Sequence, residues 1–266
     1  MTKHIVKKYV VISTKRSGTN LFFDLLIKNK LAKSDYVSKR DFEIFHPYLI
    51  QKINLKRVSL KDIITKQINK TSYINNELKI QCFKLFPAHI TYLLNKYNNE
   101  NNTRKNLNDF FDCLNSNTLY IRIERKDKIR QAVSSYKAEK TGIWISNKNY
   151  KMSIGHLLRR MKNVFFENPL SLNYDNINYI LDDLKSQEEA ISNIIDKRSL
   201  PHLNLEYEAF SKNLHKTIKG VSRFLDIKTP KINTSTDLEI QRNSNSEKLY
   251  KKYVRKKLNH LDYRAH

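Results

Sequence analysis

Glycine is scarce in this sequence: there are four in 266 residues, and Gly18 is the only one before position 142. The phosphate-binding loop of ATP- and GTP-binding proteins needs the spacing G-x-x-x-x-G-K-[ST]. The dinucleotide-binding fingerprint needs G-x-G-x-x-G. A single glycine satisfies neither spacing. The sequence therefore lacks the main support for both classes of nucleotide-binding protein.

Cysteine is also scarce. Cys82 and Cys113 are the only two, and they lie far apart with no metal-ligand spacing around them. A disulfide scaffold and a zinc site are therefore not expected. The eight histidines form no pair of the HExxH kind. We expect a functional site that uses no metal.

Long apolar runs are missing as well. No stretch approaches the ~18 consecutive apolar residues of a membrane-spanning helix. The N-terminal sequence "MTKHIVKKYVVIS" has an apolar run too short for a secretory signal. We therefore expect a cytoplasmic chain without stable membrane insertion.

Acidic residues are outnumbered: 26 Asp and Glu face 50 Lys and Arg, for a formal charge of +24. Such a charge favours anionic partners, and nucleic acid is one of them. The lysines are spread along the chain, however, and the one dense basic stretch with interleaved aromatics is "KLYKKYVRKK" at 248–257. That stretch is equally consistent with a basic C-terminal helix. We expect no nucleic-acid partner, and a basic nucleic-acid-binding protein remains an alternative.

The hydrophobic fraction of 39% and the lack of a Pro/Gly/Ser-rich linker predict a single domain over residues 1–266. Short apolar or alternating runs predict strands at 9–13, 78–87, 118–125 and 201–210. Helical spacing predicts helices at 17–29, 127–140, 174–197 and after residue 210. This alternation favours an α/β fold with a parallel sheet flanked by helices. Ligands of such sheets bind at the carboxyl ends of the strands.

The stretch "STKRSGTNL" joins the first predicted strand to the first predicted helix. A helix beginning at a strand end presents free N–H groups to an anion, and the helix dipole favours negative charge there. The turn adds two cations, two hydroxyls and a glycine that permits close backbone approach: Lys15, Arg16, Ser17, Thr19 and Gly18. The alternative is an ordinary turn in which Ser17 or Thr19 caps the helix.

Five blocks, in order between about residues 9 and 250, resemble the PAPS-dependent sulfotransferases, and within them the small bacterial branch typified by trehalose sulfotransferase. The turn is similar to P-[KR]-S-G-[ST]-[ST]. The block "IERKDKIRQAVSSYKAEKTGIW" (123–144) is similar to R-R-D-K-x-x-Q-A-V-S-x-x-x-A-x-x-T-G-x-W. The others are "EIFHP" (43–47), "FKLF" (83–86) and "LEYEAF" followed by "VSRFLDI". The resemblance implies a P-loop-like sulfotransferase fold.

The resemblance also implies a donor, 3′-phosphoadenosine 5′-phosphosulfate (PAPS), which is released as PAP. Lys15, Arg16, Ser17, Gly18 and Thr19 would hold its phosphosulfate, with Arg16 as the catalytic cation beside the bridging oxygen. Asn20 stands where the family has a second Ser or Thr, which puts one hydroxyl contact in doubt. The remaining donor-binding positions are Arg125 and Ser134 for the 3′-phosphate, Tyr207 for the adenine or ribose, and Gln241 and Arg242 closing over PAP.

On the acceptor side, the resemblance implies that Glu43 is the general base that removes the acceptor proton. His46 is the rival base, because an imidazole near the sulfur does the same work. Trp144 and His89 are candidates for lining the acceptor pocket.

We therefore expect a sulfotransferase that moves a sulfuryl group from PAPS to a hydroxyl of a small-molecule or glycan acceptor, such as a carbohydrate or glycolipid. The expectation includes no metal and allows a homodimer. The alternative enzyme is an atypical P-loop phosphotransferase, which would need a magnesium ligand at a strand end.

Overall fold

The computed structural model describes residues 5–33, 42–75, 78–114, 117–142, 144, 172–236, 238 and 244–262. The chain divides into two compact units. The first is Met1–Lys126 with Gln187–Thr236, and the second is Asp127–Ser186 with Asp237–His266. Each unit is described by itself below, and the single domain over 1–266 stays a prediction.

The first unit is built on a five-stranded sheet in the order β2-β3-β1-β4-β5. Four strands run parallel, as the sequence predicted: β1 (Ile5–Ser13), β3 (Leu78–Leu85), β4 (Thr118–Glu124) and β5 (His202–Glu206). The fifth, β2 (Ser72–Asn75), pairs antiparallel with β3 at the edge and was not predicted. Val11 lies opposite Lys84, and Ser13 lies opposite Ile123. The carboxyl ends of β1, β3 and β4 therefore meet at one edge of the sheet.

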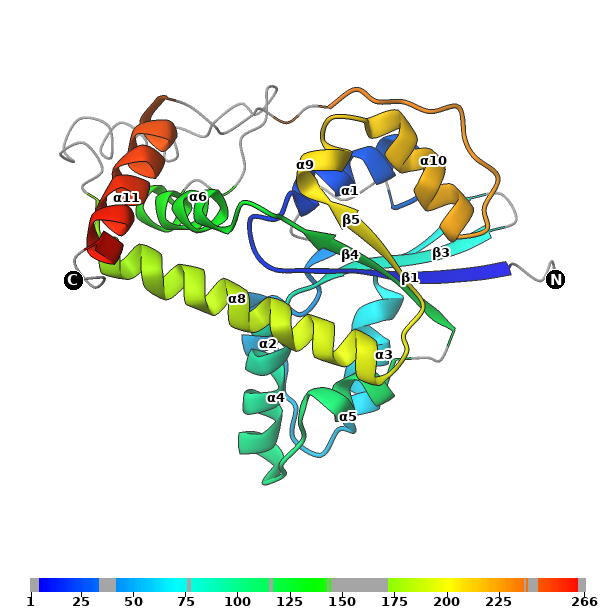
Figure 1. The fold of residues 1–266 in the computed structure, drawn as a ribbon. Coiled ribbons are helices and arrows are strands. Elements are labelled where there is room, and N and C mark those ends of the chain that lie inside the picture. Colours follow the sequence, from blue (N-terminus) through cyan, green and yellow to red (C-terminus); the bar gives the residue numbers. More distant parts are fainter. Residues whose placement is uncertain are drawn as a thin grey trace, which may run out of the picture. The chain divides into compact units, whose positions relative to one another are not determined.

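Both faces of the sheet are covered, which explains the nearly continuous apolar run of the central strand β1. Tyr9 and Val11 pack on one face with α1 (Thr19–Lys28) and α10 (Leu214–Phe224). Val10 and Ile12 pack on the other face, against three helices and the last turns of a fourth. These are α3 (Leu60–Asn69), α4 (Pro87–Asn101), α5 (Leu107–Asp112) and α8 (Tyr174–Lys197). Figure 1 shows α1 and α10 on one side of the sheet and α3, α4 and α5 on the other.

Two short helices shape the edge of the sheet where the strands end. α2 (Pro47–Gln51) begins at the last residue of the "EIFHP" block, and α9 (Tyr207–Phe210) follows β5 directly. The prediction of a strand over 201–210 was therefore wrong in its second half: β5 ends at Glu206, and Tyr207 begins a helix. Pro87, taken from the sequence as the end of a strand, also begins α4, because proline is well suited to the first helical position.

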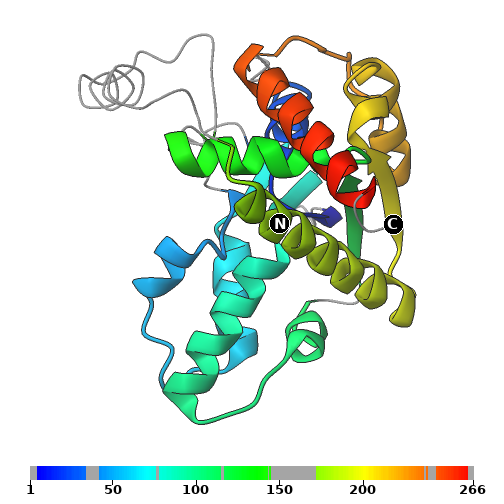
Figure 2. The same ribbon diagram turned by 60° about the vertical axis from the view of Figure 1, so that its left-hand side comes forward.

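The second unit is helical. It contains α6 (Lys128–Thr141), the first half of α8 and α11 (Ser244–Asp262), whose apolar side chains form one buried cluster. Figure 2 shows α11 in red beside α6 in green. Arg130 on α6 donates to Glu247 on α11 at 2.7 Å, and Asp127 caps the start of α6. The helices predicted at 127–140 and 174–197 are confirmed.

None of the helices in the described part of the chain is both long enough and apolar enough to cross a membrane.

Candidate active site

The turn between β1 and α1 has a backbone built around two left-handed residues. Arg16 has φ 63° and Gly18 has φ 93°. Gly18 is the N-cap residue of α1, and among the described residues no side-chain hydrogen bond caps this helix end. The alternative in which Ser17 or Thr19 caps the helix is therefore wrong, and the helix begins at Thr19 rather than at 17. Because no side chain occupies them, the first N–H groups of α1 are suited to an anion.

Ser17 supplies a second sign that the turn is built for a ligand. Its side chain is fully buried, and within the described ranges its Oγ has no hydrogen-bond partner. A buried hydroxyl without a partner costs free energy, so such groups are rare in folded proteins. An oxyanion held in the turn is the partner that this hydroxyl fits.

Tyr207 and Arg125 close around the turn. A Cβ atom added to Gly18 would lie 2.2 Å from Cδ2 of Tyr207, so only glycine permits this contact. The guanidinium of Arg125 lies 5.0 Å from the centroid of the Tyr207 ring, within cation–π range. Nη1 of Arg125 also donates to the backbone carbonyl of Arg16 at 3.4 Å. The structure thus brings four predicted donor-binding residues into one group.

Electrostatics make this group receptive to a dianion. Burial, and then the nearby charge of Arg125, lower the pKa of Arg16 to about 10, while Tyr207 acts in the opposite direction. Both guanidinium groups remain cations at neutral pH. Two half-buried cations side by side are stabilised when phosphate or other anionic groups of a ligand bind next to them.

Lys84 forms the second part of the site, and the sequence analysis did not single it out. Strand alternation puts Lys84 on the same face of β3 as Cys82, the face covered by α1. Its side chain is fully buried, and its Nζ donates to Oδ1 of Asn20 at 2.5 Å and lies 3.5 Å from Oε1 of Glu43. One ammonium therefore connects the anion turn to the candidate base. The available signal was a lysine inside the apolar run "QCFKLFP".

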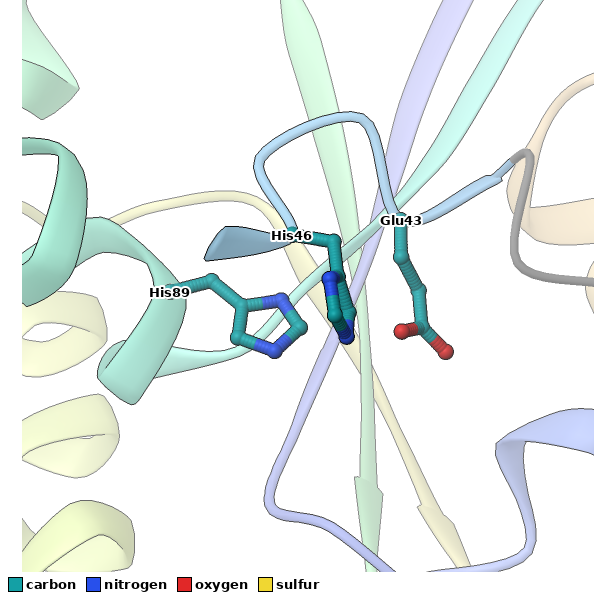
Figure 3. Close-up of side chains that lie close together, drawn as sticks. All are labelled: Glu43, His46 and His89. Carbon is teal, nitrogen blue, oxygen red and sulfur yellow. The ribbon is translucent and has the colours of Figure 1, made fainter. Parts of the chain in front are cut away.

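Two imidazoles lie beside Glu43, as Figure 3 shows. The side-chain ligand atoms of Glu43, His46 and His89 all lie within 4.8 Å of one another. His46 is the N-cap residue of α2, where its Nδ1 accepts the N–H of Tyr48 at 3.2 Å. His89 lies in the first turn of α4, with its ring centroid 5.0 Å from that of His46. Burial, and then the charges of His46 and Lys84, lower the pKa of His89 to about 3.

Two imidazoles and a carboxylate are also a common ligand set for a divalent metal. Two features oppose that use here. Nδ1 of His46 already accepts the Tyr48 N–H, so in the neutral ring the proton sits on Nε2, where a metal would need a lone pair. The Lys84 ammonium also occupies the neighbourhood of the Glu43 carboxylate. The absence of a metal stays a prediction from the sequence.

The depressed pKa of His89 predicts a specific loss of stability in acid. Between pH 6.5 and about 3 the unfolded chain binds a proton at His89 that the folded chain does not. The free energy of unfolding therefore falls as the pH falls through this range, by about 2 kcal/mol from pH 7 to pH 5. His89→Gln removes this part of the loss.

Urea unfolding at pH 7 and pH 5 measures that difference for the wild type and His89→Gln. His215→Gln, an exposed position on α10, is the matched control and should lose as much stability as the wild type. An equal pH dependence in His89→Gln and the wild type would show that His89 titrates normally in the folded protein.

The remaining predicted residues fall in different places. Lys15 is half-buried in the turn. Ser134, on α6, and Trp144 belong to the second unit, so a shared role of Ser134 and Arg125 stays a prediction. Gln241 and Arg242 lie outside the described residues.

An α/β sheet whose central strand ends in a cationic turn, linked through a lysine to a carboxylate, defines an enzyme that transfers an anionic group. The family model described as Stf0 sulphotransferase matches residues 8–256, nearly the whole chain. The protein therefore belongs to the Stf0 sulphotransferase family, and it is a sulfotransferase. The resemblance found in the five sequence blocks is confirmed at this level. No curated protein matches the chain.

Proposed function

We propose that this sulfotransferase uses PAPS as its donor and transfers the sulfuryl group to a hydroxyl of a carbohydrate or glycolipid. The observation that carries the proposal is the Lys84 link. Lys84 contacts Asn20 at the end of the anion turn and Glu43 beside the acceptor side of the site. A donor group held in the turn therefore has a carboxylate close by, which is the arrangement that proton removal from an attacking hydroxyl requires.

The donor end of the proposal assigns one task to each group. The N–H groups of the first turn of α1, the Ser17 hydroxyl and Arg16 bind the phosphosulfate. Arg125 binds the 3′-phosphate, since its planar guanidinium suits a phosphate dianion. Asn20 Oδ1 is engaged by Lys84, so Asn20 offers its amide NH₂ to the donor. Tyr207 supports the turn through Gly18 and Arg125, which is a different role from the adenine contact expected from the sequence.

At the acceptor end, Glu43 takes the hydroxyl proton as the acceptor oxygen bonds to sulfur. The bond between sulfur and the bridging phosphate oxygen breaks, and its electron pair leaves on PAP. Arg16 stabilises the charge that develops on that oxygen. Glu43, His46 and His89 present hydrogen-bonding groups in a small space, which suits a polyhydroxylated acceptor such as a sugar.

Differential scanning fluorimetry with PAP tests the donor assignment. A ligand that binds only the folded state raises the melting temperature by mass action. PAP well above its dissociation constant is expected to raise it by several degrees, roughly 2.7 kcal/mol of stabilisation at 100 times the dissociation constant. ATP with magnesium is expected to do much less. A larger response to ATP than to PAP would favour a phosphotransferase instead.

Arg125→Ala is the matching variant in that assay. Removing the charged partner of a bound phosphate is expected to weaken PAP binding by about 2 kcal/mol, or roughly 30-fold. Arg223→Ala, at an exposed position on α10, is the control and should bind PAP normally. Unchanged affinity in Arg125→Ala would remove Arg125 from the donor site.

A further inference from the structure

Two structural features of His46 together determine the tautomer of its neutral ring. Its Nδ1 accepts the backbone N–H of Tyr48 at 3.2 Å, which caps the short helix α2. Pro47, the residue between them, occupies the first turn of the helix and has no N–H of its own. While this hydrogen bond persists, Nδ1 carries no proton. The neutral ring therefore carries its proton on Nε2, and Nε2 is a hydrogen-bond donor.

The carboxylate and a second imidazole lie close to that donor. The ligand atoms of Glu43, His46 and His89 lie within 4.8 Å of one another, and in the described residues no hydrogen bond joins these three side chains. Two groups that share one oxygen through hydrogen bonds of about 2.8 Å each lie about 4.5 Å apart. The upper limit of 4.8 Å admits this arrangement, with a single hydroxyl oxygen placed between the carboxylate and an imidazole. Figure 3 shows the His46 ring between the His89 ring and the Glu43 carboxylate.

We propose that His46 donates its Nε2–H to the acceptor hydroxyl oxygen while Glu43 accepts the proton of that same hydroxyl. The proposal rests on the proposed function, because it needs a hydroxyl acceptor at this place. The oxygen then gives its proton to Glu43, receives a hydrogen bond from His46, and directs its remaining lone pair at sulfur. No proton passes to His46. His46 is thus a catalytic residue that orients the nucleophile, and it is not a second base.

His89 fits this arrangement as a neutral neighbour. Its ring lies 5.0 Å from that of His46 and 5.0 Å from that of Phe86, both edge to face. Its depressed pKa keeps it uncharged at working pH, so it adds no positive charge beside the ring of His46. The cation facing the cluster is Lys84, which lies next to Glu43. The donor role is therefore assigned to His46, whose tautomer the helix cap fixes.

Two substitutions test the roles of the two ring nitrogens of His46 separately. The Asn side chain reproduces the position of Nδ1 and is a good N-cap, but it does not reach the position of Nε2. The Gln side chain reaches the position of Nε2 with an N–H donor, but it gives a poorer cap. His46→Gln is therefore expected to keep its rate of PAP release from PAPS within about 10-fold of wild type, and His46→Asn to lose about 100-fold, the scale of one lost donor. Trehalose is the added acceptor, and water is the acceptor if no sugar reacts.

The PAP-induced rise in melting temperature is measured in the same samples, so folding and donor binding are known for each variant. Wild type without that rise contradicts the proposed function itself. With the rise present, equal losses in both variants would overturn the donor role, and so would higher activity in His46→Asn than in His46→Gln. Nitrogen NMR of histidine-labelled protein with PAP gives a readout independent of turnover. A proton on Nε2 of His46 supports the proposal, and one on Nδ1 overturns it.

Discussion

Glu43→Gln is expected to lower the rate of sulfuryl transfer about 100-fold or more, the usual scale for loss of a general base. Affinity for PAP is expected to stay unchanged. Glutamine keeps the length and shape of the side chain, but its amide does not accept the acceptor proton. Because Glu43 faces the acceptor rather than the nucleotide in the proposed arrangement, the substitution alters the chemical step alone.

The neighbourhood of Glu43 makes glutamine the right replacement. The carboxylate is mostly buried, with 16% of its side chain exposed, and it lies 3.5 Å from the buried ammonium of Lys84. Removing a partner from a buried ion pair by truncation costs stability, because the remaining charge loses its partner. The amide oxygen of glutamine still accepts a hydrogen bond from Lys84. Glu43→Gln is therefore expected to fold and to bind PAP, whereas Glu43→Ala would confuse a loss of chemistry with a loss of structure.

The measurement pairs the rate of PAP release with the PAP-induced shift in melting temperature. Glu189→Gln removes a carboxylate from an exposed position on α8 and should behave as wild type in both. If Glu43→Gln retains full activity, the base lies elsewhere in the site. If it loses both PAP binding and activity, Glu43 supports the donor turn through Lys84 and Asn20, and its assignment to chemistry alone is wrong.

The parallel strands were predictable because a strand buried on both faces leaves a nearly continuous apolar run. β1 is such a run, and it was found within a few residues. The edge strand β2 was not predicted. It pairs with a neighbour on one side only, and its sequence, "SYIN", is short and mixes polar and apolar residues. The strand prediction for 201–210 failed at Tyr207 because of tertiary packing. The alternating pattern continues into 207–210, but the chain turns into α9 there, where Tyr207 packs against Gly18.

The candidate site was predictable where the residue types alone indicate the chemistry. A turn with two cations and a glycine at a strand end indicates an anion site. The structure has Arg16 and Gly18 in the turn between β1 and α1, as predicted. The contribution of Lys84 was not recognised although the block "FKLF" contains it, because a lysine in a strand is usually a solvated side chain, and its burial depends on the register between β3 and β1. The tautomer of His46 was also hidden, since it depends on which backbone N–H the ring meets.

Gly18 is a position where the structure leaves little freedom, for two separable reasons. Its φ of 93° lies in the left-handed region, which costs an L-residue about 1 kcal/mol. A Cβ there would also lie 2.2 Å and 2.7 Å from two ring carbons of Tyr207 and 3.3 Å from Cζ of Phe210. These contacts force the ring or the turn to move. Either movement displaces the backbone that is proposed to hold the phosphosulfate.

Gly18→Ala is therefore expected to lower the free energy of unfolding by about 2–4 kcal/mol, the sum of backbone strain and overpacking. PAP affinity is expected to fall about 100-fold, or roughly 2.7 kcal/mol, the scale of one or two lost hydrogen bonds to a charged group. Urea unfolding and PAP titration measure the two effects. Both controls lie where an added Cβ meets nothing within 4 Å: Gly142→Ala, at φ 66°, isolates the backbone strain, and Gly220→Ala, in a helix, is expected to cost nothing.

A double variant separates the contact from the strain. Tyr207→Ala removes the ring that the new Cβ would meet, so the stability loss of Gly18→Ala with Tyr207→Ala is expected to be smaller than the sum of the two single losses. The left-handed strain remains in the double variant and sets the residual cost. PAP binding should stay weak, because Tyr207 also contacts Arg125. Additive losses, or normal PAP affinity in Gly18→Ala, would mean that the packing of Tyr207 on Gly18 does not set the shape of the anion turn.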